Sequence, residues 1–235
     1  MTDLAEVIGE DRWGARRLAA LTAAERSLYA SILQAFARGR LARSDRTVRV
    51  DDGHAEALAG LVERDLVGVD SGGGVVVAYP FSARATRHRV DLDDGRRLWA
   101  MCAIDALAIP YLLGRPAAFH AREPGSDRSV TVTIGAGGDT IGWEPAAATV
   151  VAARAGGGRV ADCACPFINM FASRGAAERY LDMAGRQGTM LSIPDAAAAA
   201  RAIFGALSEL LDTARAIGQS AAGGRAAGGV RSRQP

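Results

Sequence analysis

Apolar residues recur at helical spacing in the first part of the chain. Residues 23–38 carry an apolar stripe three to four positions apart, formed by Leu28, Ile32, Leu33 and Phe36. Thr22 precedes this stripe, and Glu25 three residues later completes a capping box, so a helix is expected to begin here. A second helix is predicted over residues 54–66, where apolar side chains again follow a helical period.

A hairpin is expected directly after these helices. Residues 66–69 and 75–79 are two β-type runs separated by a glycine-rich turn. Two helices followed by a hairpin indicate a winged-helix-like module, a shape that often binds DNA. Its recognition helix, however, would be acidic, carrying Glu56, Glu63 and Asp65, whereas phosphate contacts need a basic face. We therefore favour a structural or lid role for this module.

The pattern changes to mixed α/β after residue 85. Strands are predicted over residues 86–92, 117–122, 129–134, 148–153 and 189–193, and helices over 96–113 and 195–217. The second and third of these strands form an antiparallel pair around a Pro-Gly turn. The expected fold is thus α+β, with a winged-helix-like N-terminal domain (1–80), a mixed α/β catalytic domain with antiparallel strands (81–217) and a disordered tail (218–235).

Charge and hydropathy narrow the possible partners. The chain of 235 residues has 28 basic and 26 acidic residues, a net charge of +2 that does not predict nucleic-acid binding. Its apolar runs are shorter than the roughly 18 residues of a membrane span, so no membrane partner is expected. The N-terminus lacks the basic and apolar regions of a secretory signal. We expect a cytoplasmic protein.

The three cysteines are the main candidates for chemistry, because so few thiols do not make a disulfide framework. Cys102 and Asp105 are three apart and share one face of the predicted helix. Cys163 and Cys165, two apart on an extended segment, would point to the same side. Asp105 lies in an apolar stretch, where burial disfavours its anion and gives it the raised pKa that a proton donor needs.

A zinc site is the alternative use of these thiols. Its possible ligands are Cys102, Cys163, Cys165 and His120. Structural zinc sites usually show paired cysteine knuckles two residues apart, and the chain has only a single Cys-x-Cys. We therefore interpret His120 as an ordinary strand residue, and His54 and His88 as surface or loop residues.

Residues 98–115 read LWAMCAIDALAIPYLLGR, and Cys165 with the run FAS (171–173) follows downstream. Together with YPFSARATRHRV at 79–90, these motifs resemble the organomercurial (alkylmercury) lyase family over about residues 75–193. The resemblance implies a winged-helix-like region packed on a mixed α/β core. It also implies that Cys102, Cys165 and Asp105 are the catalytic residues.

The implied reaction is protonolysis of a carbon–mercury bond to a hydrocarbon and Hg(II). Mercury is a soft ion that thiolates bind well, so the two cysteines would hold it while Asp105 delivers a proton to carbon. No organic cofactor is implied, although exogenous thiols are needed for turnover. We expect Hg(II) to pass to low-molecular-weight thiols or a mercuric reductase, with Cys163 as a further mercury ligand that assists the transfer.

The chain departs from the family pattern around these residues. Many members have adjacent cysteines at the second position, whereas Cys165 is followed by Pro166 and the extra thiol, Cys163, comes two residues earlier. Met101 stands where an aromatic residue is frequent. Two alternatives follow: a relative acting on a small molecule without mercury, and a thiol-based, metal-responsive DNA-binding protein.

Overall fold

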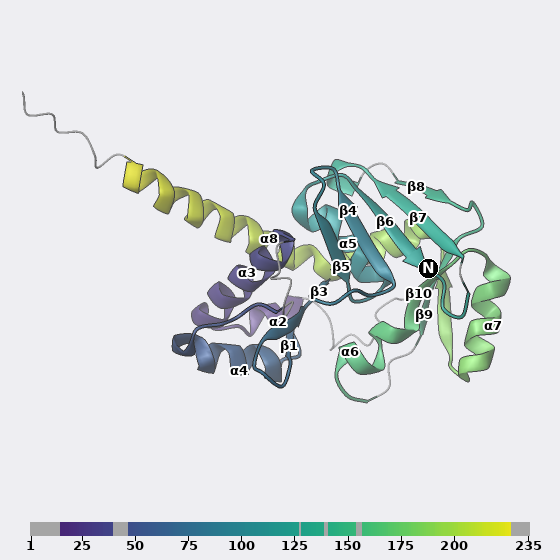
Figure 1. Cartoon of the computed structure of the whole chain (residues 1–235), viewed down its shortest axis with the longest axis horizontal. Helices are drawn as coiled ribbons and strands as arrows, with labels where there is room; N and C mark the ends of the chain where they lie inside the picture. Colours follow the sequence, from purple (N-terminus) through teal and green to yellow (C-terminus); the bar gives the residue numbers. More distant parts are fainter. Residues whose placement is uncertain (1–14, 40–46, 127, 139–140, 154–156, 227–235) are drawn as a thin grey trace, which may run out of the picture.

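The computed structural model describes residues 15–39, 47–126, 128–138, 141–153 and 157–226 (Figure 1). Its α-helices are α2 (Ala15–Ala19), α3 (Ala23–Ala37), α4 (Ala55–Glu63), α5 (Ala103–Leu113), α6 (Val160–Cys163), α7 (Arg174–Ala184) and α8 (Ile193–Ala226). Short 3-10 turns are η1 (Asp52–His54), η2 (Ala136–Gly138) and η3 (Cys165–Phe167). Within these residues no helix is both long and apolar enough to cross a membrane.

The strands form two antiparallel sheets. The larger has the order β1-β2-β3-β5-β4-β6-β7-β8 and contains β1 (Val67–Val69), β2 (Val75–Ala78), β3 (Phe81–Ser82), β4 (His88–Leu92), β5 (Arg97–Ala100), β6 (Ala117–Arg122), β7 (Ser129–Ile134) and β8 (Ile141–Glu144). The smaller has the order β10-β9-β11 and contains β9 (Thr149–Ala153), β10 (Ile168–Phe171) and β11 (Gly188–Leu191). The predicted α+β class and the antiparallel β6–β7 pair, with Ala117 opposite Ile134, are confirmed.

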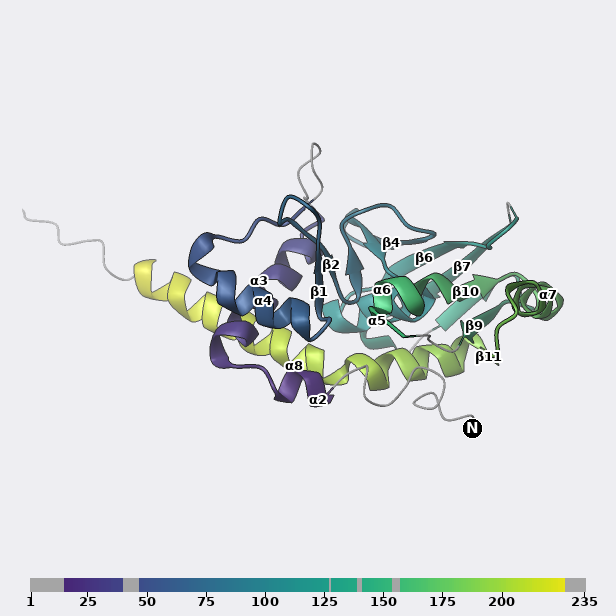
Figure 2. The same cartoon turned by 90° about the horizontal axis from the view of Figure 1, so that it is seen from below.

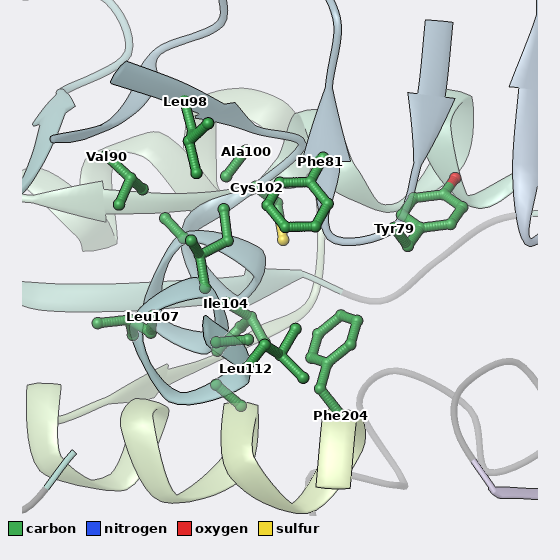
Figure 3. Close-up of a cluster of buried hydrophobic side chains, with 14 of the residues drawn as sticks. Tyr79, Phe81, Val90, Leu98, Ala100, Cys102, Ile104, Leu107, Leu112 and Phe204 are labelled. Carbon is green, nitrogen blue, oxygen red and sulfur yellow. The ribbon is translucent and has the colours of Figure 1, made fainter. Parts of the chain in front are cut away.

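Helix α5 is the centre of the core. It is apolar on all sides, as expected for a helix covered on every face. Figure 3 shows its Ile104 and Leu107 between Val90 and Leu98 of the strands and Phe204 of α8. Figure 2 shows α8 running beneath both the sheet and the N-terminal helices. Helix α8 therefore packs both against α5, which begins next to the candidate cysteine, and against the N-terminal helices α2 and α3.

The N-terminal helices form as the sequence predicts. Thr22 and Glu25 make the reciprocal capping box of α3: the Thr22 N–H donates to Glu25 Oε2 at 2.8 Å, and the Glu25 N–H donates to Thr22 Oγ1 at 3.2 Å. The predicted hairpin is the β1–β2 pair, which forms one end of the larger sheet and joins the rest of it through β3. The winged-helix assignment and the domain boundaries stay predictions.

The helix expected over 96–113 is partly wrong. Gly95, with φ of +82°, turns the chain between β4 and β5, and residues 97–100 form a strand. Leu98 and Ala100 are buried whereas Arg97 is exposed, which is the alternation of a sheet with one covered face. Only α5 is helical, so Cys102 precedes the helix.

The C-terminal helix is longer than predicted. Helix α8 continues to Ala226, beyond the expected end at residue 217. The remainder of the tail that the sequence predicts to be disordered, 227–235, lies outside the described residues.

Candidate active site

Cys102 is the N-cap of helix α5. Its backbone is extended, and its Sγ accepts a hydrogen bond from the Asp105 N–H at 3.5 Å. A capping side chain satisfies one of the free N–H groups in the first helical turn. The thiol is thus fixed at the start of α5, and only 1% of Cys102 is exposed.

The capping role of Cys102 predicts a difference between two variants. Serine is a strong N-cap and alanine is a weak one. Cys102→Ser should therefore unfold with a free energy about 1 kcal/mol higher than that of Cys102→Ala. Denaturant unfolding of both variants measures this difference, and equal stabilities would show that a capping side chain at position 102 does not stabilise α5.

Asp105 is the third residue of α5 and is completely buried. Its Oδ2 accepts a hydrogen bond from the Cys165 thiol, with 3.9 Å between sulfur and oxygen. Its Oδ1 is buried and has no hydrogen-bond partner among the described residues. A carboxylate with one unsatisfied oxygen in an apolar core is costly, so the site favours the protonated acid.

Cys165 begins η3 on the opposite side of the cluster and is 2% exposed. The next residue, Pro166, has its carbonyl held twice: Asn169 Nδ2 donates at 2.7 Å, and the Tyr180 hydroxyl donates at 3.5 Å. The Arg186 guanidinium lies 3.5 Å above the centre of the Phe167 ring. These contacts from β10, α7 and the turn after α7 fix the segment that carries the second thiol.

The fold brings Cys102, Asp105 and Cys165 together as the sequence predicts. One ligand atom from each residue lies within 4.8 Å of the other two. Two thiols and one carboxyl group, all buried, can bind a soft cation through sulfur and keep a proton beside it. The arrangement suits a reaction in which a thiophilic metal and an acid act on one molecule.

Burial controls the protonation of this cluster. Desolvation raises the pKa of Asp105 to about 7, although hydrogen bonds from Cys102 and Cys165 act in the opposite direction. Desolvation also raises the pKa of Cys102 well above its ordinary value. For Cys165, the hydrogen bond with Cys102 lowers the pKa, but burial and the charge of Asp105 outweigh it and raise the pKa. The resting site therefore holds protonated thiols beside an acid that is half-protonated near pH 7.

This raised pKa predicts how stability depends on pH. The unfolded chain loses the Asp105 proton near pH 3.8 and the folded chain near pH 7, so stability is full below 3.8 and decreases as the pH rises towards 7. Across this pH range the free energy of unfolding decreases by roughly 4 kcal/mol in total. Asp105→Asn should therefore be more stable than wild type at pH 8 but not at pH 4. Thermal unfolding at both pH values tests this, and an equal difference at both would contradict the raised pKa.

A small cavity of about 30 Å³ lies close to the cluster. Most of its lining is aromatic or aliphatic, and the charged residues Arg17 and Asp65 also line it. The Tyr29 hydroxyl donates to the Tyr79 carbonyl oxygen at 3.0 Å, and burial followed by the Asp105 charge raises the pKa of Tyr29. Figure 3 shows the sulfur of Cys102 beside Phe81, on the side of the core where Tyr79 and Phe204 lie. On this side of the core the Cys102 sulfur thus has aromatic neighbours.

The predicted arrangement of Cys163 is wrong. Its backbone belongs to α6, whereas Cys165 lies in the following 3-10 turn, so the two thiols do not share one side of an extended segment. The Cys163 thiol is half-buried and donates to the Gly158 carbonyl oxygen at 3.6 Å. Cys163 is not part of the described metal-ligating group.

The structure does not place His120 with the cysteines. Its ring lies on β6, 3.3 Å from Thr131 Oγ1 and 3.6 Å from Asp91 Oδ2, which argues against the zinc alternative. His54 is exposed, as expected. His88, expected at the surface or in a loop, is instead 2% exposed against Phe119, and burial lowers its pKa to about 4. Its side chain faces inwards because every second residue of β4 is buried and His88 is the first of them.

Comparisons with known proteins identify related sequences. The family model described as alkylmercury lyase matches residues 81–205. An alkylmercury lyase of Staphylococcus epidermidis is 30% identical over 124 residues, 52% of this chain and 56% of the relative. One of Pseudomonas putida is 34% identical over 61 residues, 26% of this chain and 28% of the relative. The matches thus span about half or less of these curated relatives.

A solved structure has the same fold. The crystal structure of the mercury-bound form of MerB2 superposes with a TM-score of 0.67 at 19% identity, covering 83% of this chain and 95% of that one.

Proposed function

Because the chain belongs to the alkylmercury lyase family, we propose that it cleaves the carbon–mercury bond of organomercurials by protonolysis. Cys102 and Cys165 are the mercury-binding thiolates, and Asp105 is the proton donor. The observation that carries this proposal is the buried group of two thiols and one carboxyl within 4.8 Å. Relatives named alkylmercury lyase and a mercury-bound structural neighbour support it.

The first steps bind the substrate R–Hg–X, where R is the organic group and X is the other ligand of mercury, a thiolate when thiol is in excess. One cysteine sulfur forms a bond to mercury, X leaves, and the thiol proton goes to X. The Asp105 carboxylate then takes the proton of the second thiol; the hydrogen bond from Cys165 to Oδ2 already lies along this path. The second thiolate binds mercury and raises the electron density on the attached carbon.

The last step uses the proton now held by Asp105. The acid gives it to carbon, the electron pair of the carbon–mercury bond forms the new C–H bond, and the hydrocarbon leaves. Mercury remains Hg(II), held by two thiolates beside the Asp105 carboxylate. A pKa of about 7 lets the same carboxyl accept a proton from a thiol and release it to carbon near neutral pH.

Release of the product requires new ligands for Hg(II). Low-molecular-weight thiols or a mercuric reductase would supply them, and no organic cofactor takes part in the proposed sequence. Cys163 lies two residues from Cys165 and is half-buried, whereas Cys165 is buried. We assign it an assisting role in this transfer.

An assisting role predicts a mild effect of Cys163→Ser. Turnover with excess thiol should stay within about twofold of wild type, because the variant keeps both mercury-binding thiols and the acid. Transfer of Hg(II) from the loaded protein to a limiting amount of thiol should be slower. Stopped-flow chelator assays measure that transfer, and loss of hydrocarbon release would instead make Cys163 essential.

The proposal is tested by incubating the protein with phenylmercury and excess thiol. Multiple turnovers that give equal amounts of benzene and Hg(II) are expected. Stoichiometric mercury binding without benzene would contradict the proposal. A DNA-binding sensor is not favoured, because Glu56 and Glu63 lie on α4 and would repel phosphate.

A further inference from the structure

The segment leading to Cys165 is held by a carboxylate that is distant in sequence. Asp65, in the turn between α4 and β1, accepts a hydrogen bond from the Val160 N–H at 2.9 Å through Oδ2. Val160 is the first residue of α6, and the residue at its N-cap, Arg159, makes no side-chain capping bond of its own. The cap of this helix therefore comes from another part of the fold.

Two arginines surround the same carboxylate. Arg159 Nε lies 3.8 Å from Asp65 Oδ1, and its guanidinium also donates to the Val62 carbonyl oxygen at 3.3 Å. Arg17 of α2 lies 3.9 Å from Asp65 Oδ2 and donates to the Asp65 carbonyl oxygen at 3.4 Å. The side chain of Asp65 is only 16% exposed, so these interactions are partly shielded from solvent. Three separate segments thus meet at one carboxylate.

The backbone of Asp65 adopts a conformation that usually selects glycine. Its φ is +54°, in the left-handed region, where the chain leaves α4. Asparagine, aspartate and glycine tolerate this region best. Glycine would fit the backbone equally well but could not hold Val160 and Arg159, so the carboxylate is what the aspartate adds here.

Helix α6 cannot fix its own position. It has four residues, and so short a helix depends on tertiary contacts because nucleation is unfavourable. Val160 is 1% exposed and lines the same cavity as Tyr79, and Cys165 follows five residues later. The distance between the two catalytic thiols therefore depends on how firmly this segment is docked.

We propose that Asp65 is a positioning residue that docks the α6 segment through Val160 and Arg159 and so holds Cys165 against Cys102 and Asp105. Its catalytic consequence rests on the proposed function, whereas its structural consequence does not.

The test compares Asp65→Gly with Asp65→Asn. Both residues accept the left-handed backbone, but glycine removes the acceptor whereas asparagine keeps an oxygen for the Val160 N–H. The readout is the alkylation rate of each cysteine by iodoacetamide, resolved by peptide mass spectrometry. A buried thiol reacts through local opening, so the rate for Cys165 reports how often its segment undocks.

Asp65→Gly should speed alkylation of Cys165 about tenfold, the effect of losing a strong cap, and change that of Cys102 less than twofold. Benzene release from phenylmercury should also fall, because the bound mercury needs Cys165 docked beside Cys102 and Asp105. Asp65→Asn should keep both the Cys165 alkylation rate and the rate of benzene release close to those of wild type. Arg64→Gln is the matched control, because it removes a comparable ion pair with Glu25, at 2.8 Å, that does not touch α6.

A wild-type alkylation rate for Cys165 in folded Asp65→Gly would overturn the proposal. Equal acceleration of both cysteines, matched by Arg64→Gln, would also overturn it by showing general destabilisation. If Asp65→Gly does not fold, Arg159→Gln replaces it: faster alkylation of Cys165 alone supports docking, and an unchanged rate contradicts it. Failure of wild type to release benzene would reject the proposed function but leave the alkylation result decisive for docking.

Discussion

Replacing Asp105 with asparagine is expected to lower phenylmercury turnover about 10²- to 10⁴-fold, the usual contribution of a general acid. The amide matches the carboxyl in shape but cannot release a proton to carbon. Both thiols remain, so the variant should still bind one equivalent of phenylmercury. Steady-state benzene release, together with mercury analysis of the isolated protein, measures the two effects separately.

Glu123→Gln provides a matched control for this loss. Glu123 is a carboxylate that is 5% exposed, and it accepts a hydrogen bond from the Ala172 N–H at 2.8 Å outside the thiol cluster. The same change from acid to amide at this position should leave turnover within a few-fold of wild type. Equal losses in the two variants would show that burial of an amide, and not the missing proton donor, explains the effect.

Replacing Cys165 with serine is expected to lower phenylmercury turnover about as much as Asp105→Asn does. The hydroxyl is a hard and much less acidic donor, so the second sulfur needed to activate the carbon–mercury bond is missing. Of the two thiols in the cluster, Cys102 remains to bind R–Hg, and the bound organomercurial should stay intact. Single-turnover assays that quantify benzene and protein-bound phenylmercury measure this result.

The combined variant provides the sharper form of this prediction. Residues that act as one unit have non-additive effects on rate. Cys165→Ser with Asp105→Asn should therefore be about as slow as either single variant. If the two losses in rate multiply in the double variant, Asp105 and Cys165 do not act in one shared step. Turnover by Cys165→Ser near the wild-type rate would exclude Cys165 from the mechanism.

Local patterns explain the part of the fold that can be predicted. The capping box at Thr22 and the alternation in β6 and β7 depend on neighbouring residues, and both are confirmed. Strand β5 escapes prediction because residues 98–113 are apolar almost throughout, a pattern that suits a buried helix or a buried strand equally. Helix α7 is absent from the predicted elements, although Ser173 at its start and Gly185 at its end are ordinary helix signals.

Both the family resemblance and the fold are needed to identify the candidate site. The resemblance points to Cys102, Asp105 and Cys165, and the structure brings them within 4.8 Å. The spacing of Cys163 and Cys165 is misleading because Pro166 belongs to a 3-10 turn, where the alternation of a strand does not apply. The contact of Asp65 with Val160 spans 95 positions, and nothing in the local sequence indicates it.

The most direct test of the central claim is a single turnover in D2O. One equivalent of phenylmercury is mixed with wild-type protein without added thiol, and the benzene and the protein are analysed by mass spectrometry. The proposed mechanism predicts benzene with one deuterium and one Hg(II) bound to the protein, because the Asp105 proton exchanges with solvent. Unlabelled benzene, or phenylmercury that stays intact on the protein, would contradict it.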